Sequence, residues 1–301
     1  MTHPPLQDPP KAALWMIGAI LSFSAMAIGG RQVSHLHDTF EIMTARSAIG
    51  FGIVLAGAAF TGQLREISAQ RLGGHALRNI VHFTGQNLWF WALTLIPLAQ
   101  LFALEFTSPL WVILLAPLLL GERFTRTRII AAALGFAGIL IVTRPFGAPL
   151  GPGVIAAAAA AIFFAMTSIL TKRLTRRETM VSILFWLTGM QFVFGALGTF
   201  WDGLVHWPDS VTGPWLFLIG GAGVLAHLSL TSALRLAPSS FVMPIDFVRL
   251  PMIAVIAAWF YDEAIDPWVL LGGVVIFFAA WLNVRSELRH KPDTLVPPAS
   301  E

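Results

Sequence analysis

The stretch "PLAQLFALEFTSPLWVILLAPLLL", residues 97 to 120, decides the fold class. It is apolar over a length that crosses the hydrocarbon core of a bilayer, yet it contains one carboxylate, Glu105. The whole chain of 301 residues has the same character, with 56% hydrophobic and only 12% charged residues and a mean hydropathy of +0.74. A soluble domain carries about a quarter charged residues. We therefore expect an all-α polytopic membrane protein.

Apolar runs of about 17–23 residues, the length of a membrane-spanning helix, recur ten times. Their approximate limits are 12–30, 40–60, 76–95, 98–120, 128–143, 153–171, 180–201, 214–234, 239–261 and 267–284. The connections between them are short and contain turn residues, so no separate soluble domain is expected. We interpret the first run as a retained helix, because no small-residue cleavage pattern of a signal peptide follows it.

The distribution of Lys and Arg predicts the orientation of these spans. If the N-terminus is inside, fifteen of these residues fall in the inner segments and only Arg31 and Arg144 fall in outer connections. Cytoplasmic loops carry the excess of positive charge in membrane proteins. Both termini are therefore predicted to be cytoplasmic.

The two halves of the chain resemble each other. "WALTLIPLAQLFALEF" from Trp91 aligns with "TSALRLAPSSFVMPIDF" from Thr231 at an offset of about 141, which places Glu105 on Asp246 and Glu122 on Glu263. Five spans per half is an odd number, so the ten transmembrane helices form two inverted five-helix repeats. The predicted parts are an N-terminal cytoplasmic tail (1–11), the first repeat (12–145), the second repeat (150–285) and a C-terminal cytoplasmic tail (286–301).

The ten spans, the two repeats and the segment that continues as "GERFTRTRIIAAALGFAGILIVTRP" (121–145) resemble the drug/metabolite transporter (DMT) superfamily, EamA-type family. The resemblance covers residues 12 to 285. It implies a secondary transporter of the bacterial inner membrane that works by alternating access. Members of this family move amino acids, nucleotides, vitamins, S-adenosylmethionine-like metabolites and toxic cations, so the resemblance leaves the substrate open.

The two acidic residues that the repeats share are the first candidates for a binding site. An ionisable group at the centre of a membrane helix costs about 2.5–3.5 kcal/mol, so it normally faces the bundle interior or a water-filled cavity. Glu105 is expected slightly outward of the membrane midplane and Asp246 slightly inward, which suits a site that opens to either side. The alternative is that each carboxylate is a neutral or paired packing residue.

Two arginines inside spans are the candidates for the opposite charge. Arg249 follows Asp246 by three residues on the same helix face, so it forms an internal ion pair or binds a carboxylate of the substrate. Arg46 has no partner at a suitable spacing on its own helix. Glu105 is its candidate partner across the bundle.

Other polar and aromatic residues complete the predicted site. His82, Gln86 and Asn87 lie in the third span, and His227 is the repeat equivalent of Gln86. They are expected either to line a cavity, where a histidine could couple protons, or to form ordinary interhelical hydrogen bonds. The aromatic residues expected to wall the cavity are Trp15, Phe23, Trp89 and Phe241. The prolines expected to interrupt or bend the fourth and ninth spans are Pro109, Pro117, Pro244 and Pro251.

The segment "HLHDTFE", residues 35 to 41, contains four possible metal ligands. It lies at a helix boundary, where Asp38 or Thr39 would cap the second span, and we favour the cap. No metal or cofactor is expected. The chain has no cysteine, which excludes disulfides and thiolate sites, and its basic residues lie in short loops, which does not favour nucleic-acid binding.

Acidic and basic residues together inside the membrane favour a small zwitterionic or mixed-charge substrate, amino-acid-like or S-adenosylmethionine-like. The alternatives are efflux of cationic drugs or toxic compounds and uptake of a vitamin such as riboflavin. Coupled protons or a counter-substrate could drive the transport, and the lipid bilayer is the other partner. An enzyme is not expected, because G-x-S-x-G and H-E-x-x-H are absent. A channel is not expected either, since no ring of pore charges is evident.

Overall fold

The computed structural model describes residues 8–120, 126–144, 150–174, 177–201, 203–236, 245–246 and 248–289. All regular structure in these ranges is helical, as a bilayer requires, because a helix pairs its own backbone N–H and C=O groups. The helices are α1 (Pro9–Val33), α2 (Thr39–Phe60), the 3-10 helix η1 (Gln63–Glu66), α3 (Leu72–Leu95), α4 (Leu98–Glu105), α5 (Ser108–Leu120), α6 (Arg126–Thr143), α7 (Pro152–Leu174), α8 (Met180–Thr199), α9 (Thr212–Leu236), α11 (Arg249–Tyr261) and α12 (Pro267–Arg289).

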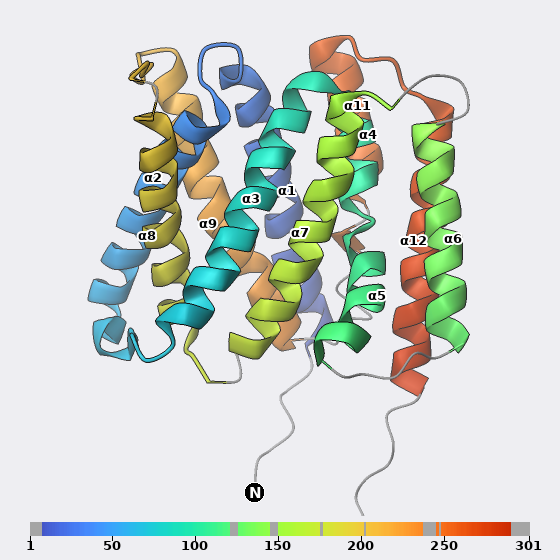
Figure 1. The fold of residues 1–301 in the computed structure, drawn as a ribbon, viewed down its shortest axis with the longest axis horizontal. Helices are drawn as coiled ribbons and strands as arrows, with labels where there is room; N and C mark the ends of the chain where they lie inside the picture. The colour runs from blue at the N-terminus through green and yellow to red at the C-terminus, as the bar shows by residue number, and fades with distance from the viewer. Residues whose placement is uncertain are drawn as a thin grey trace, which may run out of the picture.

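The helices of the two halves pair with each other rather than among themselves. The main partner of α1 is α9, that of α2 is α8, that of α3 is α7 and that of α6 is α12, while α4 contacts both α7 and α11. Figure 1 shows α6 and α12 side by side at one edge of the bundle. Exchanging the halves converts the α1–α9 pair into the α7–α3 pair and leaves the α2–α8 and α6–α12 pairs unchanged. The packing thus has the symmetry of two repeats.

The fourth span is interrupted, as its prolines predicted. The chain forms α4 and α5 there, separated by Phe106 and Thr107. Pro109 explains the break, because its ring would clash with the carbonyl of Glu105, four residues earlier, if the helix continued. As the second residue of α5, Pro109 is well placed to begin a helix. The other proline of this span, Pro117, lies within α5 and does not end it.

The ninth span also contains a boundary. Its second half is α11, which begins at Arg249 and has Pro251 as its third residue. Residues 245–246 are helical as well. Pro244 lies outside the described residues. The two spans that carry the repeated carboxylates therefore each have a helix boundary next to the carboxylate.

Among the residues that the structure describes, five helices are both long enough and apolar enough to cross a membrane. They comprise Pro10–Val33, Thr39–Phe60, Pro152–Thr171, Met180–Thr199 and Thr212–Leu230. Shorter apolar helices cover Ile129–Thr143, Arg249–Tyr261 and Pro267–Leu282. The helix of the expected third span, α3, begins at Leu72, earlier than the predicted start at residue 76. Arg78, within this helix, is buried and donates hydrogen bonds to Thr171 and Asn79.

Small residues let α6 and α12 approach closely. A Cβ atom at Gly138 would lie 3.0 Å from the carbonyl oxygen of Gly272 and 2.6 Å from Cγ1 of Ile276. A Cβ atom at Gly272 would in turn lie 2.8 Å from the carbonyl oxygen of Gly138. Backbone meets backbone at this crossing, as is common where membrane helices associate through small residues.

We expect Gly138→Ala to destabilise the protein by about 1–3 kcal/mol, the usual effect of overpacking a tight contact. Gly52→Ala in α2 is the matched control, because a Cβ atom there would have nothing within 4 Å. The control should leave stability unchanged or raise it by about 0.5–1 kcal/mol, since alanine favours the helix. Thermal unfolding of both variants in detergent tests this, and equal stabilities would contradict the close contact.

Candidate functional site

The two repeated carboxylates lie at helix boundaries. Glu105 is the last residue of α4, and Asp246 lies just before α11, whose first residue is Arg249. Because α4 packs against α11, the two boundaries lie next to each other. In a bilayer, interrupted helices are tolerated only where they are buried in protein or line a cavity.

One guanidinium joins the two carboxylates. Nη2 of Arg249 lies 3.1 Å from Oε1 of Glu105 and 3.0 Å from Oδ2 of Asp246. The structure thus contains the internal pair predicted from the spacing and adds Glu105 to it. The Arg249 side chain is only 4% exposed, and we call these three residues the Arg249 cluster. By formal charge, two carboxylates against one guanidinium leave the cluster with an excess of negative charge.

Three phenylalanine rings surround the guanidinium of Arg249. Its Cζ atom lies 4.9 Å from the ring centre of Phe23 and 5.0 Å from those of Phe102 and Phe106. Such contacts between a cation and ring faces are attractive and strengthen when water is excluded. Phe23 was predicted from the sequence, whereas Phe102 and Phe106 were not. Phe102 could have been found, because it precedes Glu105 by three residues on one helix face.

Trp89 contacts the same cluster from α3. Its indole Nε1–H donates a hydrogen bond of 2.8 Å to Oε2 of Glu105. Glu105 therefore accepts a neutral donor on one oxygen and a charged donor on the other. In contrast, Oδ1 of Asp246 is buried and has no hydrogen-bond partner among the described residues. The cluster thus retains one unused acceptor.

The proposed pairing of Arg46 with Glu105 is wrong. Nη1 of Arg46 instead contacts Oε1 of Gln191 in α8 at 3.4 Å and the sulfur of Met43 at 4.0 Å. Arg46 lines a separate small cavity between α2, α8 and α9. Gln191 was not singled out in the sequence, although it is a polar residue in the middle of an apolar span.

The histidines predicted as site residues, His82 and His227, lie between the Arg249 cluster and the cavity beside Arg46. The ring of His227 is 5.8 Å from that of Phe23 and 6.1 Å from that of His82, and His227 also lines the cavity of Arg46. Gln86 is buried, and its Oε1 has no partner within the described part of the chain. Asn87 donates a hydrogen bond to the carbonyl of Phe83 on its own helix, so this donor is used locally.

Two predicted aromatic residues are not placed at the site. Trp15 is 38% exposed, at the edge of the α1 face that buries Ala12, Met16 and Ala19. That position suits contact with lipid and not a cavity wall. Phe241 lies outside the described residues.

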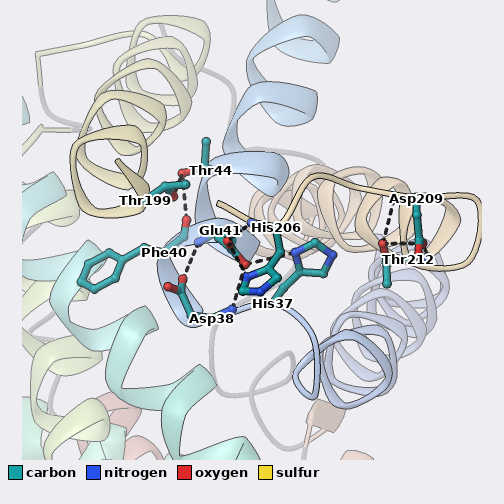
Figure 2. A network of polar contacts seen from close by, with 9 residues as sticks. All are labelled: His37, Asp38, Phe40, Glu41, Thr44, Thr199, His206, Asp209 and Thr212. Atoms are coloured by element: carbon teal, nitrogen blue, oxygen red, sulfur yellow. Dashed lines mark hydrogen bonds and ion pairs between the residues drawn. The ribbon is translucent and has the colours of Figure 1, made fainter. Parts of the chain in front are cut away.

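The segment 35–41 forms a polar network at the start of α2 (Figure 2). Asp38 caps the helix, because its side chain accepts from the N–H of Glu41 at 2.8 Å while the Glu41 side chain accepts from the N–H of Asp38 at 3.1 Å. This reciprocal capping box agrees with the predicted cap. Glu41 also contacts Nδ1 of His37 at 3.2 Å and accepts from the N–H of His206 at 2.6 Å. Glu41 therefore holds the connection between α8 and α9 against the start of α2, through His206.

The same connection has a second local anchor. Oδ1 of Asp209 accepts hydrogen bonds from the N–H of Thr212 at 2.7 Å and from its hydroxyl at 2.9 Å (Figure 2). These bonds lower the pKa of Asp209 below its usual value. The described residues contain no group of three or more His, Cys, Asp or Glu side chains arranged to hold a metal ion.

A charged contact closes the end of the bundle where α1 and α11 end. Glu263 accepts from Arg31 at 3.1 Å and from the N–H of Leu98, the first residue of α4, at 2.8 Å. Arg31 also donates to the carbonyl of Ile96 at 2.8 Å. We call Arg31 and Glu263 with these backbone groups the terminal closure. It ties α11 to α1 and to the start of α4.

A bundle of apolar helices in two packed repeats, with charged groups of both signs inside, defines a multi-pass membrane protein of the transporter class. The EamA-like transporter family matches residues 10–144 and again residues 151–285. The chain belongs to this family, which is part of the DMT superfamily.

Proteins with named substrates are similar to this chain over nearly their whole length. An S-adenosylmethionine uptake transporter of Rickettsia conorii is 26% identical, over 91% of this chain and 92% of its own. A riboflavin transporter of Vibrio cholerae is 30% identical, over 94% of this chain and 96% of its own. A solved crystal structure has the same fold, with a TM-score of 0.66 and 19% identity over 93% of this chain and 99% of its own. The chain is therefore a membrane transporter of small metabolites.

Proposed function

We propose that the protein moves an amino-acid-like or S-adenosylmethionine-like metabolite across the bacterial inner membrane by alternating access. The observation that carries this proposal is the Arg249 cluster, in which one arginine holds a carboxylate from each repeat. A cationic group of the substrate, or a proton, would compete with Arg249 for Glu105 and Asp246. The competition would loosen the contact between the halves at the point where both helices are interrupted.

The proposed orientation follows from the basic residues. Both termini are cytoplasmic, so the terminal closure lies at the outer side. The two repeats, residues 12–145 and 150–285, act as the units that exchange conformations. In this orientation the terminal closure blocks the outer side of the bundle, so the structure corresponds to a state closed to the outside.

A second candidate substrate is riboflavin. Relatives named riboflavin transporters are 30% and 31% identical to this chain. The rings of Phe23, Phe102 and Phe106 around Arg249 would suit a flat, conjugated ligand. Riboflavin carries no positive group, however, and would leave the excess negative charge of the cluster unmatched.

Neutralising either carboxylate tests the proposal. In proteoliposomes, Glu105→Gln and Asp246→Asn are each expected to reduce uptake of the transported metabolite by tenfold or more, because each removes half of the charge that a cationic group would contact. A thermal-shift screen with S-adenosylmethionine, riboflavin and amino acids identifies the metabolite, since a bound ligand stabilises the folded protein. Glu66→Gln in η1 is the control, because Glu66 is exposed and its side chain contributes none of the ion pairs found. Undiminished uptake by both cluster variants would refute the proposed site.

A further inference from the structure

Two side chains that line the cavity beside Arg46 each have a buried donor group with no acceptor among the described residues. Arg46 is 7% exposed and its Nε–H has no partner among the described residues. Gln191 is 1% exposed and its Nε2 amide donors are likewise unpartnered. Both side chains border one cavity of about 20 Å³, which holds roughly one water molecule. Buried donors of this kind are costly unless an acceptor reaches them.

The described region around Arg46 also has positive charge without a matching negative charge. In the ranges that the structure describes, no carboxylate lies within ion-pair distance of Arg46 or of Arg78. Both arginines are buried, Arg46 at 7% and Arg78 at 5% exposed. An unpaired buried charge is strongly unfavourable, so the arrangement calls for an anion.

Two aromatic rings in contact, those of Phe23 and His227, connect the Arg249 cluster with this cavity. The ring of Phe23 contacts both Arg249 and the ring of His227, and His227 borders the cavity. The bundle interior thus has a region with excess negative charge and, beyond Phe23 and His227, a region with excess positive charge.

We propose that the cavity beside Arg46 binds the carboxylate of the transported molecule, with Arg46 and Gln191 as donors. This inference rests on the proposed function and narrows its substrate class to zwitterions, with the cationic group at the Arg249 cluster. The planar guanidinium suits a carboxylate, which it can bind through two N–H groups. A carboxylate is larger than one water, so α2, α8 and α9 must separate as it enters. The alternating-access motion supplies that separation.

The first experiment needs no knowledge of the substrate. Melting temperatures of the purified protein are compared in sodium acetate and sodium chloride of equal ionic strength, at about 0.3 M. Acetate should raise the melting temperature of the wild type by about 2 °C above the chloride value, as expected for weak binding. Arg46→Gln should abolish this difference, while Arg65→Gln, a change of an exposed arginine in η1, should retain it.

The stability of the variant separates a binding role from a structural one. In chloride, Arg46→Gln should melt at or above the wild-type temperature, because it removes an unpaired buried charge. If Arg46 instead supported the fold through a partner, its loss would lower the melting temperature. A lower melting temperature together with an unchanged acetate effect would overturn the proposal.

The second experiment uses two probes that differ only in the carboxylate, S-adenosylmethionine and its decarboxylated form. The wild type should bind the former at least tenfold more tightly, and Arg46→Gln should bind both equally. If the acetate effect depends on Arg46 but no metabolite is transported, the proposed function fails while the anion site stands. If acetate acts equally on the wild type and on Arg46→Gln, the anion site fails, whatever the transported molecule is.

Discussion

Replacing Arg249 with glutamine is expected to lower the melting temperature by on the order of 10 °C and to stop transport. The substitution leaves the carboxylates of Glu105 and Asp246 together in the bundle interior without their shared counter-charge. Breaking a buried ion pair by removing one partner costs about 3–5 kcal/mol. The loss also removes the cation from the faces of Phe23 and Phe102. Thermal unfolding in detergent and uptake by proteoliposomes measure the two effects.

Two further variants show which property of Arg249 matters. Adding Glu105→Gln to Arg249→Gln should restore part of the lost stability, because only one carboxylate then remains without a partner. Arg249→Lys keeps the charge but not the flat guanidinium that contacts three rings. Its melting temperature should therefore lie between those of the wild type and the Arg249→Gln variant. A melting temperature of Arg249→Gln equal to that of the wild type would show that the cluster contributes no net stability.

The second large effect is expected at the terminal closure. Glu263→Gln weakens two charge-assisted hydrogen bonds, to Arg31 and to the N–H of Leu98, by about 2 kcal/mol in total. A change of this size shifts an equilibrium between closed and open forms roughly 30-fold toward the open form. Because the chain has no cysteine, a single Ile28→Cys provides a clean reporter. Ile28 lies on α1, one turn before Gln32, and its carbonyl accepts from the hydroxyl of Tyr261.

Labelling of the introduced cysteine by a membrane-impermeant maleimide measures the opening. Its rate should increase by more than tenfold when Glu263 is replaced, and only from the side that we propose to be outer. Asp266→Asn is the matched control, because Asp266 pairs with Arg144 at the same end of the bundle but with both side chains more exposed. An exposed pair contributes about 0–1 kcal/mol, so this control should change labelling little. Equal labelling rates with and without the Glu263→Gln substitution would show that the closure does not control access.

The features that repeat in the sequence were the ones that could be predicted. Glu105 and Asp246 were found because the offset of about 141 residues places one on the other, and Arg249 was found because it is the third residue after Asp246. Both relations are local or periodic, so they need no knowledge of how the helices pack. The three residues do form one cluster in the structure.

Features that depend on packing between helices could not be predicted. Arg46 was assigned Glu105 as a partner because both are isolated charges in apolar spans, yet α2 packs against α8 and brings Arg46 to Gln191. The burial of Arg78 could not be predicted either, because its partner Thr171 lies on α7. The break at Glu105 follows from Pro109. Whether a proline bends a helix or ends it, however, depends on whether neighbouring helices provide hydrogen-bond partners for the backbone groups that the proline leaves unpaired.

The pairing of helices across the two halves has a consequence for how the protein is made. The helix synthesised first, α1, has as its main partner α9, which begins at residue 212. At a synthesis rate of about 5–20 residues per second, roughly ten to forty seconds pass between the completion of α1 and the appearance of that partner. During this interval the buried face of α1 is held by lipid or by the insertion machinery. The charged interior is therefore assembled only near the end of translation. A ribosome that stalls in the second half leaves a chain whose first helices are inserted in the membrane but whose Arg249 cluster has not yet formed.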